Sequence, residues 1–267
     1  GMGPVRVGNQ AHEHFQHDTY GNIILGAAPA FFDRRLFMTA DEAAFEMLEP
    51  LGELAWQLHD QPDAGIWELR TRARVHTSSA VMCWAACDRL SKIATHLGLG
   101  DAQTFWGGRA ETIRKRTLEG AWSEKRQAFV ESVGGETLDA SVLLMGEVGM
   151  VPRDDPRFAA TVDRLSEVLG RGAFMMRYEE ADDFGAPEVG FNVCAFWRLD
   201  ALARIGRTGE AREHFTDLLA ARNSLGLMAE DTDFRTGEAW GNFPQTYSMV
   251  GIINGAVRLS KPWESEI

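Results

Sequence analysis

Apolar residues recur at helical spacing along most of the chain. In 41–60 one helix face carries Phe45, Leu48, Leu51, Ala55 and Leu58. The same spacing appears in 155–169, at Phe158, Val162, Leu165 and Leu169, and in 208–222, at Ala211, Phe215, Leu218 and Leu219. The pattern predicts helices near 11–37 (interrupted at Pro29), 41–60, 76–98, 101–119, 138–148, 155–169, 191–206, 208–222 and 243–259.

Residues that start and stop helices support several of these boundaries. Thr39 and Glu42 form a capping-box pattern before the helix at 41–60. Asp155 and Gly170 enclose the helix at 155–169, with Pro156 in its first turn, and Thr208 is expected to cap the helix at 208–222. The chain is therefore expected to be all-α.

Short and long connections alternate along the predicted helices. The long ones lie near 61–75, 120–137, 170–190 and 223–242. Short turns join helices into antiparallel hairpins, and every second connection of such an array lies at the same end. We therefore expect the long loops to share one rim of a solenoid or a closed α/α ring.

Composition narrows the possible functions and partners. The chain of 267 residues is 45% hydrophobic and 25% charged, which suits a globular domain. Its net charge of −12, without a basic stripe, argues against nucleic acid, and no apolar run is long enough for a membrane span. Three cysteines, Cys83, Cys87 and Cys194, are too few for a disulfide framework, so we expect buried thiols and a cytoplasmic protein.

The motifs of several common enzyme classes are absent. The sequence has no GxSxG, P-loop, GxGxxG or HExxH pattern. His12, His14 and His17 cluster without carboxylates to complete a metal site, so a polar helix face is the preferred interpretation. We expect neither a metal nor a cofactor.

Carboxylates on the loop rim remain as candidate chemistry. Glu68 follows an apolar Gly-Ile-Trp stretch, Glu230 follows LGLMA, and Glu188 lies on the loop between helices. A lone loop glutamate is usually a solvated surface charge. Apolar neighbours, however, disfavour the charged form of a carboxyl group, as a general acid requires. Carboxylates together with aromatic residues also suit a surface that binds and cleaves sugars.

Several long blocks resemble glycoside hydrolase family 15, the bacterial glucoamylase and trehalase-like enzymes. In order, these blocks are PVRVGNQAHEHFQHDTYGNI, GIWELR with HTSSAVMCWAACDRL, LDASVLLMGEVGMVPRDDPRFAATVDRL, PEVGFNVCAFWRLDALARIGRTGEA and LGLMAEDTDFRTGEAWGNFPQTYSMVGIINGA. The resemblance implies an (α/α)6 toroid of the six-hairpin type, incomplete, with about nine of twelve helices. Residues 1–267 would form a single catalytic domain that lacks its N-terminal helices and the upstream β-sandwich domain.

The resemblance also implies roles for individual residues. Glu68 matches the general acid and Glu230 the general base of an inverting hydrolase that releases glucose from an α-linked glucoside. The substrate-binding positions of the family fall on Trp67, Arg177, Glu188, Phe191, Asp18 and Tyr20. The pattern leaves open whether an α-1,4, α-1,6 or α,α-1,1 linkage is cleaved.

Departures from the family pattern support an alternative function. The Arg-Asp sugar clamp of the family lies upstream of the matched blocks, and Met249 stands where bacterial relatives carry His. A truncated, weakly active or inactive carbohydrate-binding homologue is therefore the second hypothesis, and a helical scaffold for protein partners is the third. We also expect a second copy of the chain, or residues 11–37, to cover the open side of the toroid.

Overall fold

A computed structural model describes residues 10–36, 39–182 and 185–260. The chain divides into two compact units. The N-terminal unit consists of Gly8–Trp122 with Glu131–Gly135, and the C-terminal unit consists chiefly of Ser123–Val130 and Glu136–Ile267.

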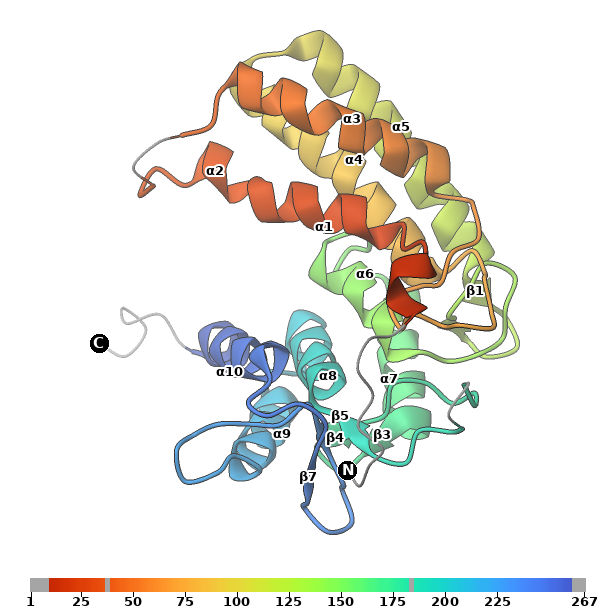
Figure 1. The fold of residues 1–267 in the computed structure, drawn as a ribbon, viewed down its shortest axis with the longest axis vertical. Helices are drawn as coiled ribbons and strands as arrows, with labels where there is room; N and C mark the ends of the chain where they lie inside the picture. Colours follow the sequence, from red (N-terminus) through yellow and green to blue (C-terminus); the bar gives the residue numbers. More distant parts are fainter. Residues whose placement is uncertain (1–9, 37–38, 183–184, 261–267) are drawn as a thin grey trace. The chain divides into compact units, whose positions relative to one another are not determined.

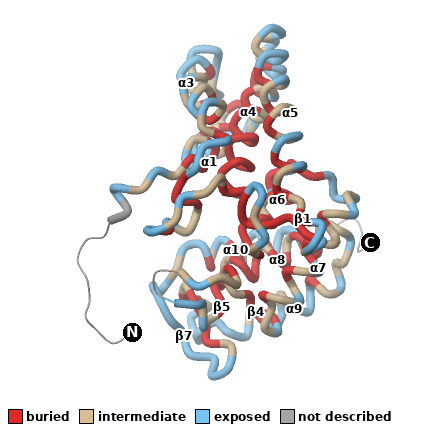
Figure 2. The backbone as a smooth tube through the Cα atoms, turned by 90° about the vertical axis from the view of Figure 1, so that its right-hand side faces the viewer, coloured by how far each residue is buried: buried red, intermediate tan, exposed pale blue. Residues whose placement is uncertain are grey.

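One central helix organises the N-terminal unit. The elements are η1 (Gln10–Glu13), α1 (Asp18–Ala27), α2 (Pro29–Phe32), α3 (Glu42–Leu58), α4 (Thr77–Leu97) and α5 (Gly100–Gly120). Helix α4 packs against α1, α3 and α5 (Figure 1), and its residues 77–87 are all buried (Figure 2). A Cβ on Gly21 of α1 would lie 2.1 Å from the carbonyl oxygen of Met82, so only glycine permits this approach of α1 to α4.

The C-terminal unit is built around helix α8. Its helices are η2 (Ala140–Leu143), α6 (Leu144–Glu147), α7 (Pro156–Leu169), α8 (Asn192–Arg204), α9 (Thr208–Ala220) and α10 (Thr246–Leu259). Helix α8 contacts α6, α7, α9 and α10. Phe158, Val162, Leu165 and Leu169 of α7 are all fully buried, as the apolar spacing predicted.

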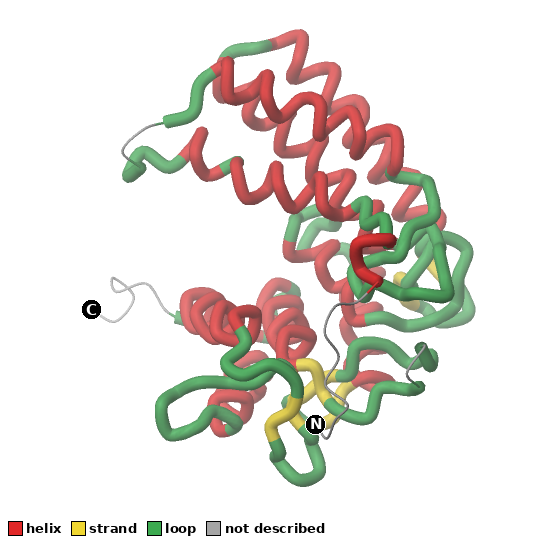
Figure 3. Tube along the Cα trace, viewed as in Figure 1, coloured by secondary structure: helices red, strands yellow, loops and turns green. Residues whose placement is uncertain are grey.

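Short strands lie in the connections between helices (Figure 3). The two-residue strands are β1 (Trp122–Ser123), β2 (Ala128–Phe129), β3 (Gly170–Arg171), β4 (Phe174–Met175), β5 (Gly190–Phe191), β6 (Asp231–Thr232) and β7 (Ala239–Trp240). Strands β1 and β2 pair, β3 and β4 pair, and β5, β6 and β7 form a three-stranded antiparallel sheet. The sequence did not predict these strands, because two residues are too few to show an alternating pattern.

The expected all-α class is confirmed, with corrections at several helix ends. The helix predicted over 11–37 is shorter, because the chain becomes extended at Asp33 after α2; residues 37 and 38 lie outside the described residues. Asp155 caps α7 as predicted, accepting a hydrogen bond from the backbone N–H of Arg157. The capping box at Thr39 was wrong: Asp41 caps α3 by accepting a hydrogen bond from the N–H of Ala44. Thr208 is the first residue of α9 and does not cap it.

Two further expectations concern thiols and membranes. Cys83, Cys87 and Cys194 are free and buried, as predicted. Burial raises the pKa of the Cys87 thiol to about 12, so this group stays protonated at neutral pH. Among the described helices, none is both long and apolar enough to cross a bilayer.

Candidate active site

Glu68 lies on a tight turn in the loop between α3 and α4. Its backbone N–H donates to the carbonyl of Gly65 at 3.2 Å, and the N–H of Leu69 donates to the carbonyl of Ala64 at 3.0 Å. Glu68 has φ of 54°, in the left-handed region that residues with a side chain rarely adopt. Its side chain is exposed and Trp67 beside it is half-buried. The apolar residues that precede Glu68 therefore do not bury its carboxyl group.

A buried carboxylate fixes the base of this loop. Asp63 Oδ2 accepts hydrogen bonds from the backbone N–H of His17 at 2.8 Å and from Ser79 Oγ at 2.7 Å. Asp63 also pairs with Arg74 through two backbone hydrogen bonds that close the loop. The loop that carries Glu68 is thus tied to the segment before α1 and to the first turn of α4.

Asp18 and Tyr20 lie on α1 of the same unit. Asp18 is buried, and its Oδ2 accepts a hydrogen bond from Asn22 Nδ2 at 3.1 Å. Burial and, to a smaller extent, the nearby Asp63 raise the pKa of Asp18. Tyr20 is half-buried. Asp18, His17, Asp63 and Ser79 therefore form a buried polar cluster beside the Glu68 loop.

This cluster does not form a metal site in the described part of the chain. There, no group of three or more His, Cys, Asp or Glu side chains is arranged to hold a metal ion. The pKa of the buried His76 imidazole is lowered chiefly by its burial, which favours the neutral ring. That ring lies directly against the turn, because a Cβ on Gly65 would lie 2.8 Å from it.

In the C-terminal unit, β-structure holds the backbone of Glu230. The N–H of Glu230 donates to the carbonyl of Asn242 at 2.9 Å, and its carbonyl accepts from the N–H of Asn192 at 3.0 Å. These bonds extend the sheet in which Asp231 of β6 pairs with Phe191 of β5 and Trp240 of β7. The hairpin β6–β7 therefore carries the chain back to Glu230.

The half-buried side chain of Glu230 accepts its hydrogen bonds from the segment 242–245. Its Oε2 accepts hydrogen bonds from the backbone N–H of Asn242 at 2.9 Å and from Asn242 Nδ2 at 3.0 Å. Its Oε1 has a longer contact, 3.5 Å, with Gln245 Nε2. Several hydrogen bonds from one short segment fix the orientation of this carboxylate.

Arg177 and Phe191 both lie close to Asp231, the residue that follows Glu230. The guanidinium carbon of Arg177 lies 4.9 Å from the centroid of the Phe191 ring, and Arg177 Nη2 lies 3.7 Å from Asp231 Oδ1. Burial raises the pKa of Asp231 to about 6; Arg177 acts against this rise, and Glu230 adds to it. Arg177, Phe191 and the carboxyl groups of Glu230 and Asp231 therefore lie close together at this sheet.

Glu188 is a predicted site residue, whereas three residues around Glu230 were not predicted. Glu188 is exposed; together with the stronger effect of Asp233, it raises the pKa of Arg235. Asp231, Asn242 and Gln245 were not among the predicted site residues. Their only sequence signal was proximity to Glu230 within one matched block, because the hairpin that brings Asn242 back was not predicted.

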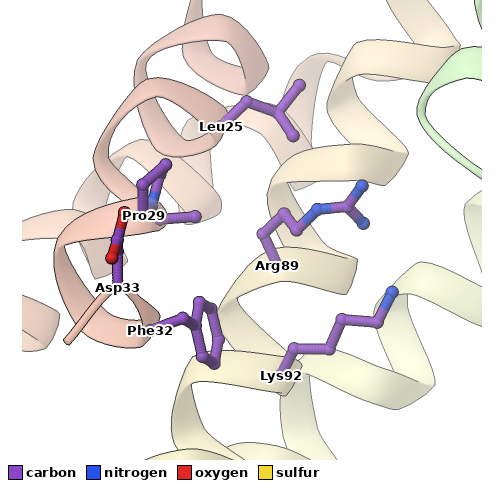
Figure 4. Close-up of a pocket in the computed structure, with 7 residues that line it drawn as sticks. Leu25, Pro29, Phe32, Asp33, Arg89 and Lys92 are labelled. Carbon is purple, nitrogen blue, oxygen red and sulfur yellow. The ribbon is translucent and has the colours of Figure 1, made fainter. Parts of the chain in front are cut away.

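The larger of the two described cavities lies away from these residues. It measures about 610 Å³ and opens between α1, α2 and α4 (Figure 4). Leu25, Pro29 and Phe32 supply its apolar wall. Its charged groups are already paired: Lys92 Nζ lies 2.8 Å from Asp88, Arg89 also pairs with Asp88, and Asp33 pairs with Arg35. The cavity contains none of the predicted site residues.

Curated relatives match nearly the whole chain. The trehalase of Mycolicibacterium smegmatis is 35% identical over 264 residues, covering 98% of this chain and 39% of the trehalase. The trehalase of Thermoplasma volcanium is 32% identical over 267 residues, covering 98% of this chain and 42% of the trehalase. The chain therefore spans about two fifths of the length of the trehalases that it matches.

Solved structures share the fold at low sequence identity. One glycosidase variant has a TM-score of 0.78 and 18% identity, over 92% of this chain and 67% of that chain. Another glycosidase variant, in complex with glucose, has a TM-score of 0.77 and 19% identity over the same shares of 92% and 67%. A bacterial glucoamylase complexed with acarbose has a TM-score of 0.73 and 13% identity, over 92% of this chain and 41% of that chain. The expected fold class, that of the six-hairpin glycosidases, is thereby confirmed.

The sequence model of glycosyl hydrolases family 15 matches residues 1–257. This match covers nearly the whole chain and agrees with the trehalase relatives and with the fold. The chain belongs to glycosyl hydrolases family 15.

Proposed function

We propose that the chain hydrolyses an α-linked glucoside with inversion at the anomeric carbon. Glu68, protonated, donates its proton to the glycosidic oxygen as the bond from that oxygen to the anomeric carbon breaks. Glu230, ionised, takes a proton from the water that attacks the opposite face of the same carbon. The products are a sugar with inverted configuration and a free hydroxyl on the leaving group.

The environment of Glu230 is the observation that carries this proposal. Two donors of Asn242 hold Oε2 of its carboxylate, at 2.9 and 3.0 Å. Such contacts fix the orientation of the carboxylate, which a general base must present to the attacking water. Glu68 is exposed on a turn that two backbone hydrogen bonds close.

Arg177 and Phe191 are proposed to bind the sugar beside Glu230. A guanidinium offers a planar set of donors for hydroxyl groups, and an aromatic ring offers an apolar face for a pyranose. Arg177 already lies over the Phe191 ring, which limits the conformations it must give up on binding. Trp67, Asp18, Tyr20 and Glu188 are proposed as further contacts with the substrate.

Trehalose is the substrate we favour. The matched relatives are trehalases, and they are 35% and 32% identical to the chain. Maltose and isomaltose are the comparison substrates, because a bacterial glucoamylase shares the fold. The three buried free cysteines suit a reducing compartment, so we place this activity in the cytoplasm.

Glucose release from the three disaccharides tests the proposal. We expect turnover by the wild-type chain and a loss of about a thousandfold or more in kcat for both Glu68→Gln and Glu230→Gln, because each removes an essential proton transfer. Glu213→Gln, an exposed glutamate on α9 that is not among the proposed site residues, is the matched control. Full activity of either Gln variant would exclude that glutamate from the mechanism.

The same variants distinguish hydrolysis from the alternative function. Sugar binding by calorimetry without glucose release would favour a weakly active or inactive carbohydrate-binding homologue. A crystal structure with a bound sugar would add the separation of the two carboxyl groups. We expect about 6.5–9.5 Å, the distance that admits a water molecule in inverting enzymes. A separation near 5 Å would contradict inversion.

A further inference from the structure

The two carboxylate oxygens of Glu230 have different surroundings. Asn242 donates to Oε2 twice, from its backbone N–H at 2.9 Å and from Nδ2 at 3.0 Å. Among the described residues, Oε1 has only the 3.5 Å contact with Gln245 Nε2, at the outer limit of a hydrogen bond. Oε2 is therefore occupied by the protein, whereas Oε1 keeps most of its capacity to accept a proton.

The backbone around Asn242 makes this arrangement possible. Gly241 has φ of 74°, and a Cβ on it would lie 2.6 Å from Glu230 Oε2 and 2.8 Å from Glu230 Cβ. Glycine at this position thus leaves the space that the carboxylate fills. The N–H of Gln245 donates to the carbonyl of Met228 at 3.0 Å, which fixes the far end of the segment.

Helix α10 supports the same arrangement. It begins at Thr246, directly after Gln245, whose side-chain oxygen accepts a hydrogen bond from the N–H of Tyr247 and caps the helix. Ser248 Oγ donates to the carbonyl of Ala229 at 2.8 Å, so the first turn of the helix is bonded to the residue before Glu230. The segment 241–245 is therefore held at both ends.

We propose that Asn242 is a positioning residue that fixes Oε2 of Glu230 and thereby selects Oε1 as the atom that takes the proton from water. The inference rests on the proposed role of Glu230 as the base. The other charged groups at this position are Asp231, next in β6, and Arg177, which lies 3.7 Å from Asp231. Neither supplies a hydrogen bond to Oε2 among the described residues.

Two substitutions at Asn242 separate positioning from space filling. Asn242→Ala removes one donor, and kcat should fall about tenfold with KM within about twofold, because a hydrogen bond to a charged group is lost. Asn242→Asp keeps the size of the side chain but places a second negative charge beside Glu230, so kcat should fall about tenfold further. A space-filling role would reverse this order. Asn254→Asp, exposed on α10, is the matched control and should leave kcat unchanged.

Hydrogen exchange of the Asn242 backbone amide tests the same contact without turnover. In the wild-type chain this amide should exchange slowly, and Glu230→Ala should accelerate it about tenfold because its acceptor is removed. The amide of Asp233, which donates to the carbonyl of Glu238 at 2.9 Å in the same hairpin, should keep its rate. Exchange at Asn242 that is unaffected by Glu230→Ala would overturn the inference.

The results also separate this inference from the proposed function. If Glu230→Gln abolishes hydrolysis but Asn242→Asp is at least as active as Asn242→Ala, Glu230 remains the base and the role of Asn242 is wrong. If Glu230→Gln retains full activity, the proposed base is wrong, whatever the exchange rate of Asn242. If the exchange prediction holds and kcat follows the expected order, both are supported.

Discussion

Burial and charge act in opposite directions on the carboxyl group of Asp231. Burial disfavours its ionised form and raises its pKa to about 6, whereas Arg177, 3.7 Å away, favours the ionised form. The ordinary value is 3.8, so the folded protein holds this proton more tightly than the unfolded chain does. The carboxyl group of Asp231, beside the proposed base, therefore reduces the stability of the folded protein at neutral pH.

Asp231→Asn should stabilise the protein in a pH-dependent way. Below pH 3.8 the carboxyl is protonated in both states and has no effect; as pH rises to about 6, its contribution to stability falls, and above this value the loss is complete. The gain in Tm of the variant over wild type should therefore grow between pH 4 and 6 and level off above. A rise of the order of 2 °C at pH 7 is expected for a chain of this size. Thermal melts of both proteins at several pH values provide the measurement.

A constant difference in Tm across this pH range would contradict the assignment. Asp233→Asn is the matched comparison, because the pKa of Asp233 is lowered, first by its hydrogen bond with the Arg235 side chain, to about 2. Removing that carboxyl should give no gain that grows between pH 4 and 6. The two aspartates lie two positions apart in the same hairpin, so local effects on folding are similar.

At the scale of elements, helices were predictable and the site's hairpin was not. Long apolar stripes such as that of α7 extend over several turns, so the spacing alone places the helix, and Asp155 and Pro156 mark its start. Hairpin β6–β7 rests on two-residue strands and on backbone bonds around Glu230, which leave no repeating pattern in the sequence. The sequence therefore indicated Glu230 but not Asn242, whose proposed role depends on where the hairpin returns.

Glycine in α3 illustrates packing between elements. A Cβ on Gly52 would lie 2.3 Å from Leu90 Cδ1 and 2.7 Å from Trp106 Cη2, so α3 reaches α4 and α5 only without a side chain there. Gly52→Ala should lower the free energy of unfolding by about 1–3 kcal/mol, as overpacking does. Urea denaturation followed by circular dichroism measures the change.

Gly26→Ala is the control for helix propensity. Gly26 lies in α1, and an added Cβ would meet nothing within 4 Å. This variant should gain about 0.5–1 kcal/mol, because alanine favours the helix over glycine. Equal effects of both substitutions would mean that packing around Gly52 relaxes freely.

At the scale of the whole molecule, an apolar stripe on α10 has no cover among the described residues. Tyr247, Val250, Ile253 and Val257 follow one another at helical spacing, with exposed fractions of 65%, 44%, 60% and 71%. Contiguous apolar surface of this kind marks sites of association. The expectation that a second copy, or residues 11–37, covers the open side of the toroid stays a prediction. This stripe is the surface on which to test the second copy.

Sedimentation velocity over a range of protein concentrations provides that test. We expect the wild-type chain to associate as concentration rises, and the double variant Ile253→Lys and Val257→Lys to remain a monomer, because burying two charges costs more than the contact gains. The double variant Thr216→Lys and Asp217→Lys, at exposed positions on α9, is the control. A wild-type chain that is monomeric at about 100 μM would contradict self-association, since specific interfaces hold below this concentration.

The left-handed backbone of Glu68 costs folding stability at a residue whose proposed role is chemical. At φ of 54° a residue with a side chain costs roughly 1 kcal/mol relative to glycine. A protein designer who optimised this loop for thermal resistance alone would choose glycine or asparagine here. If Glu68 has its proposed role, glutamate at this position exchanges some stability for activity. Directed evolution of this chain for heat tolerance, without selection for hydrolysis, should therefore discard Glu68 early.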